Sequence, residues 1–159
     1  ISSAYEYIVC ADSGTDYAMA AGIIPNLVMG DLDSISDEGR KFIDDNKISL
    51  ELFPVEKDMT DSELVIRKFS SDDNIMFVGS LGGRVDHTMS NITLCCRLHS
   101  EGYSITFTDG VSYIIPMYGS ETITLSEIDN KRNLIAMRMN DVIDMWKCLI
   151  QSDLHRCIN

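Results

Sequence analysis

The stretch Gly30-Asp31-Leu32-Asp33-Ser34 decides which fold this sequence predicts. It directly follows the apolar run 27–29, which is typical of a short buried strand, and it places two carboxylates one residue apart. Two further polar clusters, 57–61 (Lys-Asp-Met-Thr-Asp) and 81–87 (Leu-Gly-Gly-Arg-Val-Asp-His), also come before expected helices. This layout predicts a metal-dependent phosphate site at the edge of an α/β sheet.

The hydrophobic pattern around these clusters alternates between strands and helices. Strands are expected at 5–11, 27–29, 48–53, 75–78 and 104–108, and helices at 15–21, 36–46, 60–69 and 85–99. This order predicts a three-layer α/β/α sandwich with a mostly parallel, Rossmann-like sheet. Further along, short antiparallel strands are expected at 111–115 and 121–125, then a strand at 134–139 and a helix at 141–150.

Composition narrows the class of protein. The chain has 159 residues, one domain's worth, and a net charge of −12 from 13 basic and 25 acidic residues. Such a charge argues against nucleic acid and anionic membranes as partners. The five cysteines form no CxxC pair, and there is no signal peptide or membrane-length apolar run, so a cytoplasmic protein is expected. Because the first residue is Ile1, we expect the chain to be cut from something longer or to lack its first residues.

Several charged side chains fall at the carboxyl ends of the expected strands, where open α/β sheets bind ligands. They are Asp12, Asp31, Asp33, Asp58, Asp61, Arg84 and Asp86. Two ionised carboxylates held close together repel unless a cation lies between them, and Mg2+ suits such oxygen ligands. For the pair Asp31 and Asp33 alone, the alternative is an Asx-turn that only shapes the loop.

The other two clusters also have structural alternatives. Thr60 and Glu63 fit a capping box, in which acids at a helix start are stabilising without any function. Gly82 and Gly83 would let the backbone approach a ligand, and Arg84 could hold phosphate oxygens in a bidentate fork. The alternative for this segment is a tight turn with a surface arginine.

Taken together, these segments resemble the catalytic domain of the thiamine pyrophosphokinase family. The resemblance covers residues 5–115 and rests on five segments: 11–14 (Ala-Asp-Ser-Gly), 22–25 (Gly-Ile-Ile-Pro), 30–35 (Gly-Asp-Leu-Asp-Ser-Ile), 58–61 (Asp-Met-Thr-Asp) and 81–87. It implies transfer of a pyrophosphate group from ATP to thiamine with Mg2+, giving AMP and thiamine diphosphate, in a homodimer.

The resemblance also implies roles for individual residues. Asp31, Asp33 and Asp61 would hold the metal and the triphosphate, and Arg84 would neutralise charge on the transferring phosphate. The remaining expected contacts to the nucleotide are Asp12, Asp58, Thr60, Gly82, Gly83 and Asp86.

The sequence departs from the family at three places. Ser13 stands where the family has glycine, we expect the family's first strand and helix to be absent before Tyr5, and residues 116–159 hold no Ser-Asn pair. We therefore expect a catalytic domain at 1–115 and a partial or divergent segment at 116–159 in place of the family's thiamine-binding β-domain. Two alternatives stay open: a pyrophosphokinase for another alcohol such as a pterin, and a catalytically impaired nucleotide-binding module.

Overall fold

The computed structural model describes residues 7–53, 59–81, 84–117 and 133–138. The chain divides into two compact units, residues 1–69 and 70–159. Among the described residues, no helix combines the length and the apolar character needed to span a lipid bilayer.

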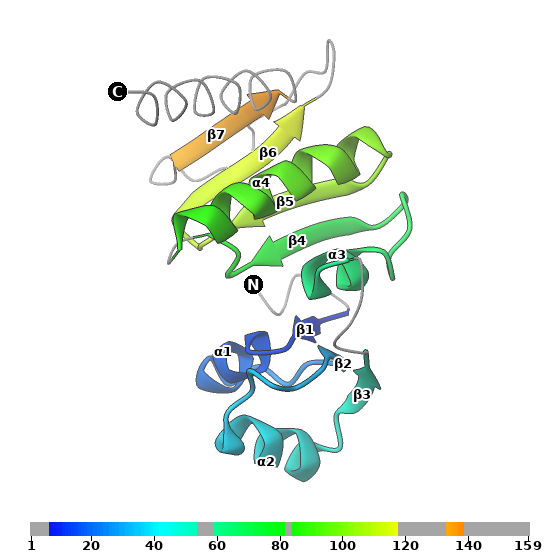
Figure 1. Cartoon of the computed structure of the whole chain (residues 1–159), viewed down its shortest axis with the longest axis vertical. Helices are drawn as coiled ribbons and strands as arrows, with labels where there is room; N and C mark the ends of the chain where they lie inside the picture. Colours follow the sequence, from blue (N-terminus) through cyan, green and yellow to red (C-terminus); the bar gives the residue numbers. More distant parts are fainter. Residues whose placement is uncertain (1–6, 54–58, 82–83, 118–132, 139–159) are drawn as a thin grey trace, which may run out of the picture. The chain divides into compact units, whose positions relative to one another are not determined.

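The described part of the first unit forms a parallel sheet with three helices (Figure 1). Its strands are β1 (Val9–Ala11), β2 (Leu27–Gly30) and β3 (Ser49–Leu52), in the order β1-β2-β3. The helices are α1 (Gly14–Ala20), α2 (Asp37–Asn46) and α3 (Asp61–Ile66). Because every strand pair is parallel, the carboxyl ends of these strands meet at one edge of the sheet.

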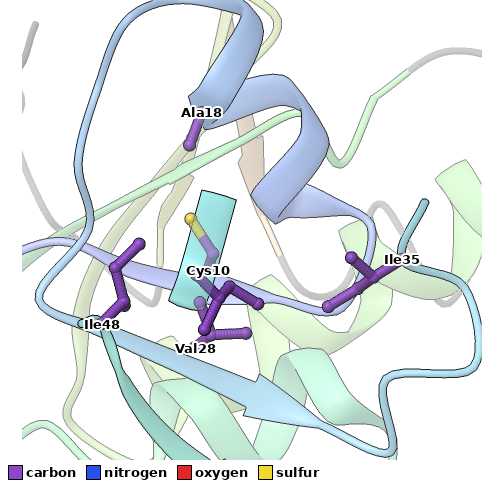
Figure 2. Packing of buried hydrophobic residues seen from close by; sticks show 6 residues of the cluster. Cys10, Ala18, Val28, Ile35 and Ile48 are labelled. Carbon is purple, nitrogen blue, oxygen red and sulfur yellow. The ribbon is translucent and has the colours of Figure 1, made fainter. Parts of the chain in front are cut away.

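One cluster of buried side chains holds α1 and α2 to this sheet. Cys10 and Val28 on adjacent strands pack with Ala18 of α1 and Ile43 of α2, and Ile35 and Ile48 complete the cluster. Figure 2 shows the labelled members pointing toward one another. Burying a large aliphatic side chain contributes about 1.5–3 kcal/mol, so this cluster fixes the strand ends on which the polar loops begin.

In the second unit, the described residues form a mixed sheet and one long helix (Figure 1). Strands β4 (Asn74–Val78) and β5 (Ser104–Thr108) are parallel, β6 (Ser112–Met117) runs antiparallel to β5, and β7 (Asn133–Arg138) runs parallel to β6. Helix α4 (Val85–Ser100) connects β4 to β5 and buries Leu98 completely. The rings of Phe77 and Phe107 meet edge to face, with centroids 4.9 Å apart, and join the two parallel strands.

The expected mixture of strands and helices is confirmed in the described part of the chain, with small shifts in the boundaries. The expected helix 60–69 is α3, which ends at Ile66, and the expected strand 5–11 is β1, which begins at Val9. The antiparallel strand expected at 111–115 is β6. The expected strand at 121–125 and helix at 141–150 lie outside the described residues.

Candidate active site

Asp12 and Gly30, at the ends of β1 and β2, approach each other so closely that position 30 must be glycine. The backbone N–H of Asp12 donates to the carbonyl of Met29 at 3.0 Å, which continues the strand pairing. Gly30 has a φ of +147°, and a Cβ added there would lie 1.8 Å from Asp12 Oδ1. No side chain fits in that space, so Gly30 allows the Asp12 carboxylate to lie against the loop that follows β2.

Leu32, between the two aspartates of that loop, has an unusual backbone conformation. Its φ is +63°, in the left-handed region, which costs a non-glycine residue about 1–2 kcal/mol. Two features stabilise it: the Leu32 N–H donates to Asp12 Oδ1 at 3.1 Å, and the side chain packs against the core cluster of Figure 2. Asp12 itself has a φ of +40°. Two such residues in contact with each other are typical of functional sites.

The backbone of the loop turns tightly around Leu32. Asp31 Oδ1 accepts a hydrogen bond from the Asp33 N–H at 3.1 Å, and Ser34 Oγ donates to Asp33 Oδ1 at 2.6 Å. The Asx-turn considered from the sequence is therefore present. The turn and a ligand-binding role are compatible, because each aspartate has a second carboxylate oxygen and further lone pairs.

The carboxylates of this unit influence one another electrostatically. Partial burial raises the pKa of Asp12 above its ordinary value, and the negative charges of Asp61, Asp31 and Asp33 raise it further. The hydrogen bond from the Leu32 N–H acts in the opposite direction. The Asp12 carboxylate is thus influenced by the negative charges of three aspartates that the sequence assigned to the same site, and such repulsion favours a cation or a proton beside it.

Asp61 enters this group from the first turn of α3. The helix begins after Thr60, whose side chain accepts a hydrogen bond from the Glu63 N–H at 3.3 Å, so the expected cap is confirmed. Glu63 itself is buried and pairs with Arg67 at 2.9 Å. Since Thr60 fixes the start of the helix, it also fixes the position of Asp61, the next residue.

In the second unit, Arg84 and Asp86 form an exposed ion pair at the start of α4. Arg84 donates from Nε at 3.1 Å and from a terminal guanidinium nitrogen at 2.5 Å to the two oxygens of Asp86. These hydrogen bonds from Arg84 lower the pKa of Asp86 to about 2, and the N–H and charge of His87 act in the same direction. Both side chains are largely exposed, so the guanidinium is open to solvent as well as paired.

The donor set of the first unit fits a hard divalent cation. Mg2+ prefers carboxylate oxygens and is commonly held by one or two carboxylates together with substrate phosphates. Within the described ranges, no group of three or more histidine, cysteine, aspartate or glutamate side chains is arranged to hold a metal ion by itself. Such a site would therefore need the phosphates of a nucleotide to complete the coordination of Mg2+.

Three expected site residues are not described. Asp58, Gly82 and Gly83 lie outside the described ranges. Ser13, the departure from the family pattern, has a φ of −56°, which any residue adopts, so glycine is not required at this position.

Sequence reasoning missed two residues that support the site, Asp16 and Arg40. Asp16 of α1 accepts hydrogen bonds from the Ser36 N–H at 3.1 Å and from Ser36 Oγ at 2.5 Å. Arg40 of α2 donates from its guanidinium to the carbonyl of Leu32. Ser36 caps the start of α2. Helical side chains lean toward the N-terminus of their helix, so Arg40, one turn after Ser36, could have been expected to reach back to the loop.

Comparison with known proteins identifies relatives of this chain. The family model described as "Thiamin pyrophosphokinase, catalytic domain" matches residues 1–107. The chain is 32% identical over 123 residues to the thiamine pyrophosphokinase of Bacillus subtilis, an alignment that covers 76% of this chain and 57% of that protein.

Solved structures give the same result. A thiamin pyrophosphokinase family protein from Enterococcus faecalis is 28% identical, with a TM-score of 0.56 over 67% of this chain and 52% of its own. The structure of the Bacillus subtilis thiamine pyrophosphokinase is 31% identical, with a TM-score of 0.53 over 64% of this chain and 48% of its own. The chain therefore spans about half the length of the relatives it matches.

Proposed function

This chain belongs to the thiamin pyrophosphokinase family, and we propose that it transfers a pyrophosphate group from ATP to thiamine. The products are thiamine diphosphate and AMP. The observation that supports this proposal is that Asp12 follows β1, that Asp31 and Asp33 follow β2, that Asp61 begins α3, and that the charges of the latter three aspartates raise the pKa of Asp12. A group of carboxylates that repel one another is suited to a cation and its phosphate ligands.

The reaction forms one bond and breaks one. The hydroxyl oxygen of thiamine bonds to the β-phosphorus of ATP, the bond from that phosphorus to the oxygen bridging it to the α-phosphate breaks, and AMP leaves. The hydroxyl proton passes to water or to a carboxylate. Such a transfer depends on positioning and charge stabilisation more than on covalent chemistry by the protein.

Asp31, Asp33 and Asp61 are the residues we assign to Mg2+ and the triphosphate. Bound Mg2+ would neutralise phosphate charge and reduce the repulsion among the carboxylates. We assign to Asp12 the orientation of the loop, through its bond to the Leu32 N–H. Thr60, Asp58, Gly82, Gly83 and Asp86 are proposed nucleotide contacts, and Arg84 is proposed to neutralise charge on the transferring phosphate.

The remaining proposals concern architecture and setting. We propose a three-layer α/β/α catalytic domain at 1–115, which the family match over 1–107 supports, and a divergent acceptor-side segment at 116–159. In β2, Val28 packs in the core with α1 and α2. The next residue, Met29, is also buried, and because side chains alternate along a strand it points to the opposite face of the sheet. We also propose that the protein is a homodimer. We propose that it is cytoplasmic, because buried free thiols such as those of Cys10 and Cys95 are common in that compartment.

The test of the reaction is to incubate the protein with ATP, Mg2+ and thiamine and to separate the nucleotide products. We expect equal amounts of AMP and thiamine diphosphate. AMP formed with a pterin alcohol but not with thiamine would support another acceptor, and nucleotide binding without turnover would support an impaired module.

Substitutions in the loop test the site. Asp31→Asn and Asp33→Asn keep the side-chain oxygens that accept the turn hydrogen bonds but remove the charge. We expect each to lower the rate of AMP formation at least about 100-fold, as for other groups that stabilise developing charge. Asp37→Asn, an exposed acid in the first turn of α2, is the matched control and should keep the rate of the parent. Equal rates for Asp31→Asn and the parent would show that the site is assigned to the wrong residues.

A further inference from the structure

The two peptide groups on either side of Leu32 are held by side chains from two different elements. The N–H of Leu32 donates to Asp12, which follows β1, and its carbonyl accepts from Arg40, which lies on α2. The next N–H along the chain, that of Asp33, donates to Asp31. Both bonds to Leu32 therefore set the orientation of the peptides that carry the two aspartates.

We propose that Arg40 is a positioning residue for the reaction, one that acts on Asp31 and Asp33 through the Leu32 carbonyl. This inference rests on the proposed function, because it assigns Arg40 to the same site. Arg40 holds the Leu32–Asp33 peptide in one orientation, and this orientation directs both carboxylates toward a common ligand. Small errors in the placement of reacting groups are known to cost orders of magnitude in rate.

The helix that carries Arg40 is itself fixed at the end nearest the loop. Ser36 caps α2 by accepting from the Gly39 N–H at 2.9 Å, and Asp16 of α1 binds both polar groups of Ser36. Gly39 is buried, and a Cβ added there would lie 2.3 Å from Asp16 Oδ1. The first turn of α2 is thus held against α1, so the backbone that carries Arg40 is held in place next to the loop.

Arg40 uses its guanidinium differently from Arg67 and Arg97, two other arginines in the described part of the chain. Arg67 pairs with Glu63, and Arg97 pairs with Glu101, each four residues away along the same helix. Arg40 reaches outside its helix to a backbone carbonyl, although α2 carries several acids. Because the Arg40 guanidinium is bonded to the peptide between Asp31 and Asp33, it also places a positive charge near these two carboxylates.

The test compares Arg40→Met with Lys41→Met, in which the neighbouring exposed cation of the same helix is removed. Three quantities are measured in each variant: hydrogen exchange of the Leu32 and Asp33 amides by NMR, the melting temperature, and kcat and KM for AMP formation. Arg40→Lys is the conservative variant, because an ammonium group can donate one hydrogen bond to the same carbonyl.

We expect Arg40→Met to speed exchange of these two amides about tenfold and to lower kcat by about 10- to 100-fold, with KM for thiamine unchanged. Lys41→Met should match the parent, and Arg40→Lys should recover part of the lost kcat. Exchange and kcat equal to those of Lys41→Met would overturn the proposal. So would a general loss of protection across residues 7–53 with a lowered melting temperature, since that result means a structural role only. If the parent makes no AMP, the proposed function fails, and the amide exchange still decides whether Arg40 holds the loop.

Discussion

The carboxylates around Asp12 and the ion pair of Arg84 with Asp86 use charge in opposite ways. In the first group, burial and neighbouring negative charges raise the pKa of Asp12. In the pair, hydrogen bonds from the guanidinium lower the pKa of Asp86 to about 2. The Asp12 carboxylate therefore lies near like charges, whereas the Asp86 carboxylate is paired with a cation.

The two regions also differ in how their backbone is held. The first depends on a close approach of Asp12 to Gly30 and on left-handed φ values at Asp12 and Leu32. The second consists of two exposed side chains at the start of a helix, and its geometry is local. In this protein, like charges therefore lie near one another in the region whose backbone is tightly constrained. This combination is typical of ligand-binding sites.

The largest effect is expected from Gly30→Ala, which breaks the close approach in the first region. The added Cβ would overlap the Asp12 carboxylate, and the backbone has a φ that favours glycine. We expect a loss of about 2–4 kcal/mol in the free energy of unfolding, measured by urea denaturation. Gly22→Ala is the control, because its φ of +68° also favours glycine but nothing lies within 4 Å of the added atom. The control should cost only about 1 kcal/mol, and an equal loss in both variants would contradict the role of the close approach.

A smaller effect is expected from Asp12→Asn, which removes the repulsion and keeps the oxygen that accepts from Leu32. The pKa of Asp12 is raised in the folded state, so the folded state binds the proton more tightly than the unfolded state. Stability from this group is therefore present below the unfolded pKa of about 3.9 and is lost as the pH rises through the folded pKa.

The melting temperature of Asp12→Asn should accordingly exceed that of the parent by no more than a few degrees at pH 7, because the group is only partly buried. The difference should vanish below about pH 3.9, where Asp12 is protonated in both states. Added Mg2+ should raise the melting temperature of the parent more than that of the variant, since less repulsion remains to be relieved. A variant less stable than the parent at pH 7 would contradict the electrostatic account.

The smallest effect on stability is expected from Arg84→Met, which removes the cation of the second region. The pKa of Asp86 should rise from about 2 toward the ordinary value, followed by carboxyl NMR during an acid titration. Because a lowered pKa stabilises the fold only above the unfolded pKa, this contribution is lost as the pH falls toward 2. Asp109 is the control: the N–H groups of Ser112 and Val111 lower its pKa, and the substitution should not move it. An unmoved pKa of Asp86 would show that the pair does not form in solution.

Much of the local structure could be predicted from the sequence, because short-range chemistry determines it. Thr60 was identified as a cap from residue type and spacing alone, and it accepts the expected backbone hydrogen bond. The Asx-turn at Asp31 follows from the same short-range rule. The placement of Asp12, Asp31 and Asp33 after neighbouring parallel strands of one sheet was predicted from topology, since such strands end at one edge.

The supporting contacts could not be predicted, because they join residues far apart in the chain. Asp16 binds Ser36, 20 residues away, and nothing local distinguishes Asp16 from other helix acids. The need for Gly30 depends on where the Asp12 side chain lies, which only the folded structure shows. Arg40 is the exception: the direction in which helical side chains lean points it back toward the loop, although its hydrogen bond to the Leu32 carbonyl is shown only by the folded structure.

Binding of a non-transferable nucleotide tests the central claim, that the carboxylates around Asp12 take up a divalent cation together with a triphosphate. The measurement is calorimetric titration of the protein with α,β-methylene ATP, with Mg2+ and again with EDTA. We predict binding at least about tenfold tighter with Mg2+ for the parent and for Asp37→Asn, and loss of this difference in Asp31→Asn. Equal affinity with and without Mg2+, or a full Mg2+ effect in Asp31→Asn, would contradict the claim.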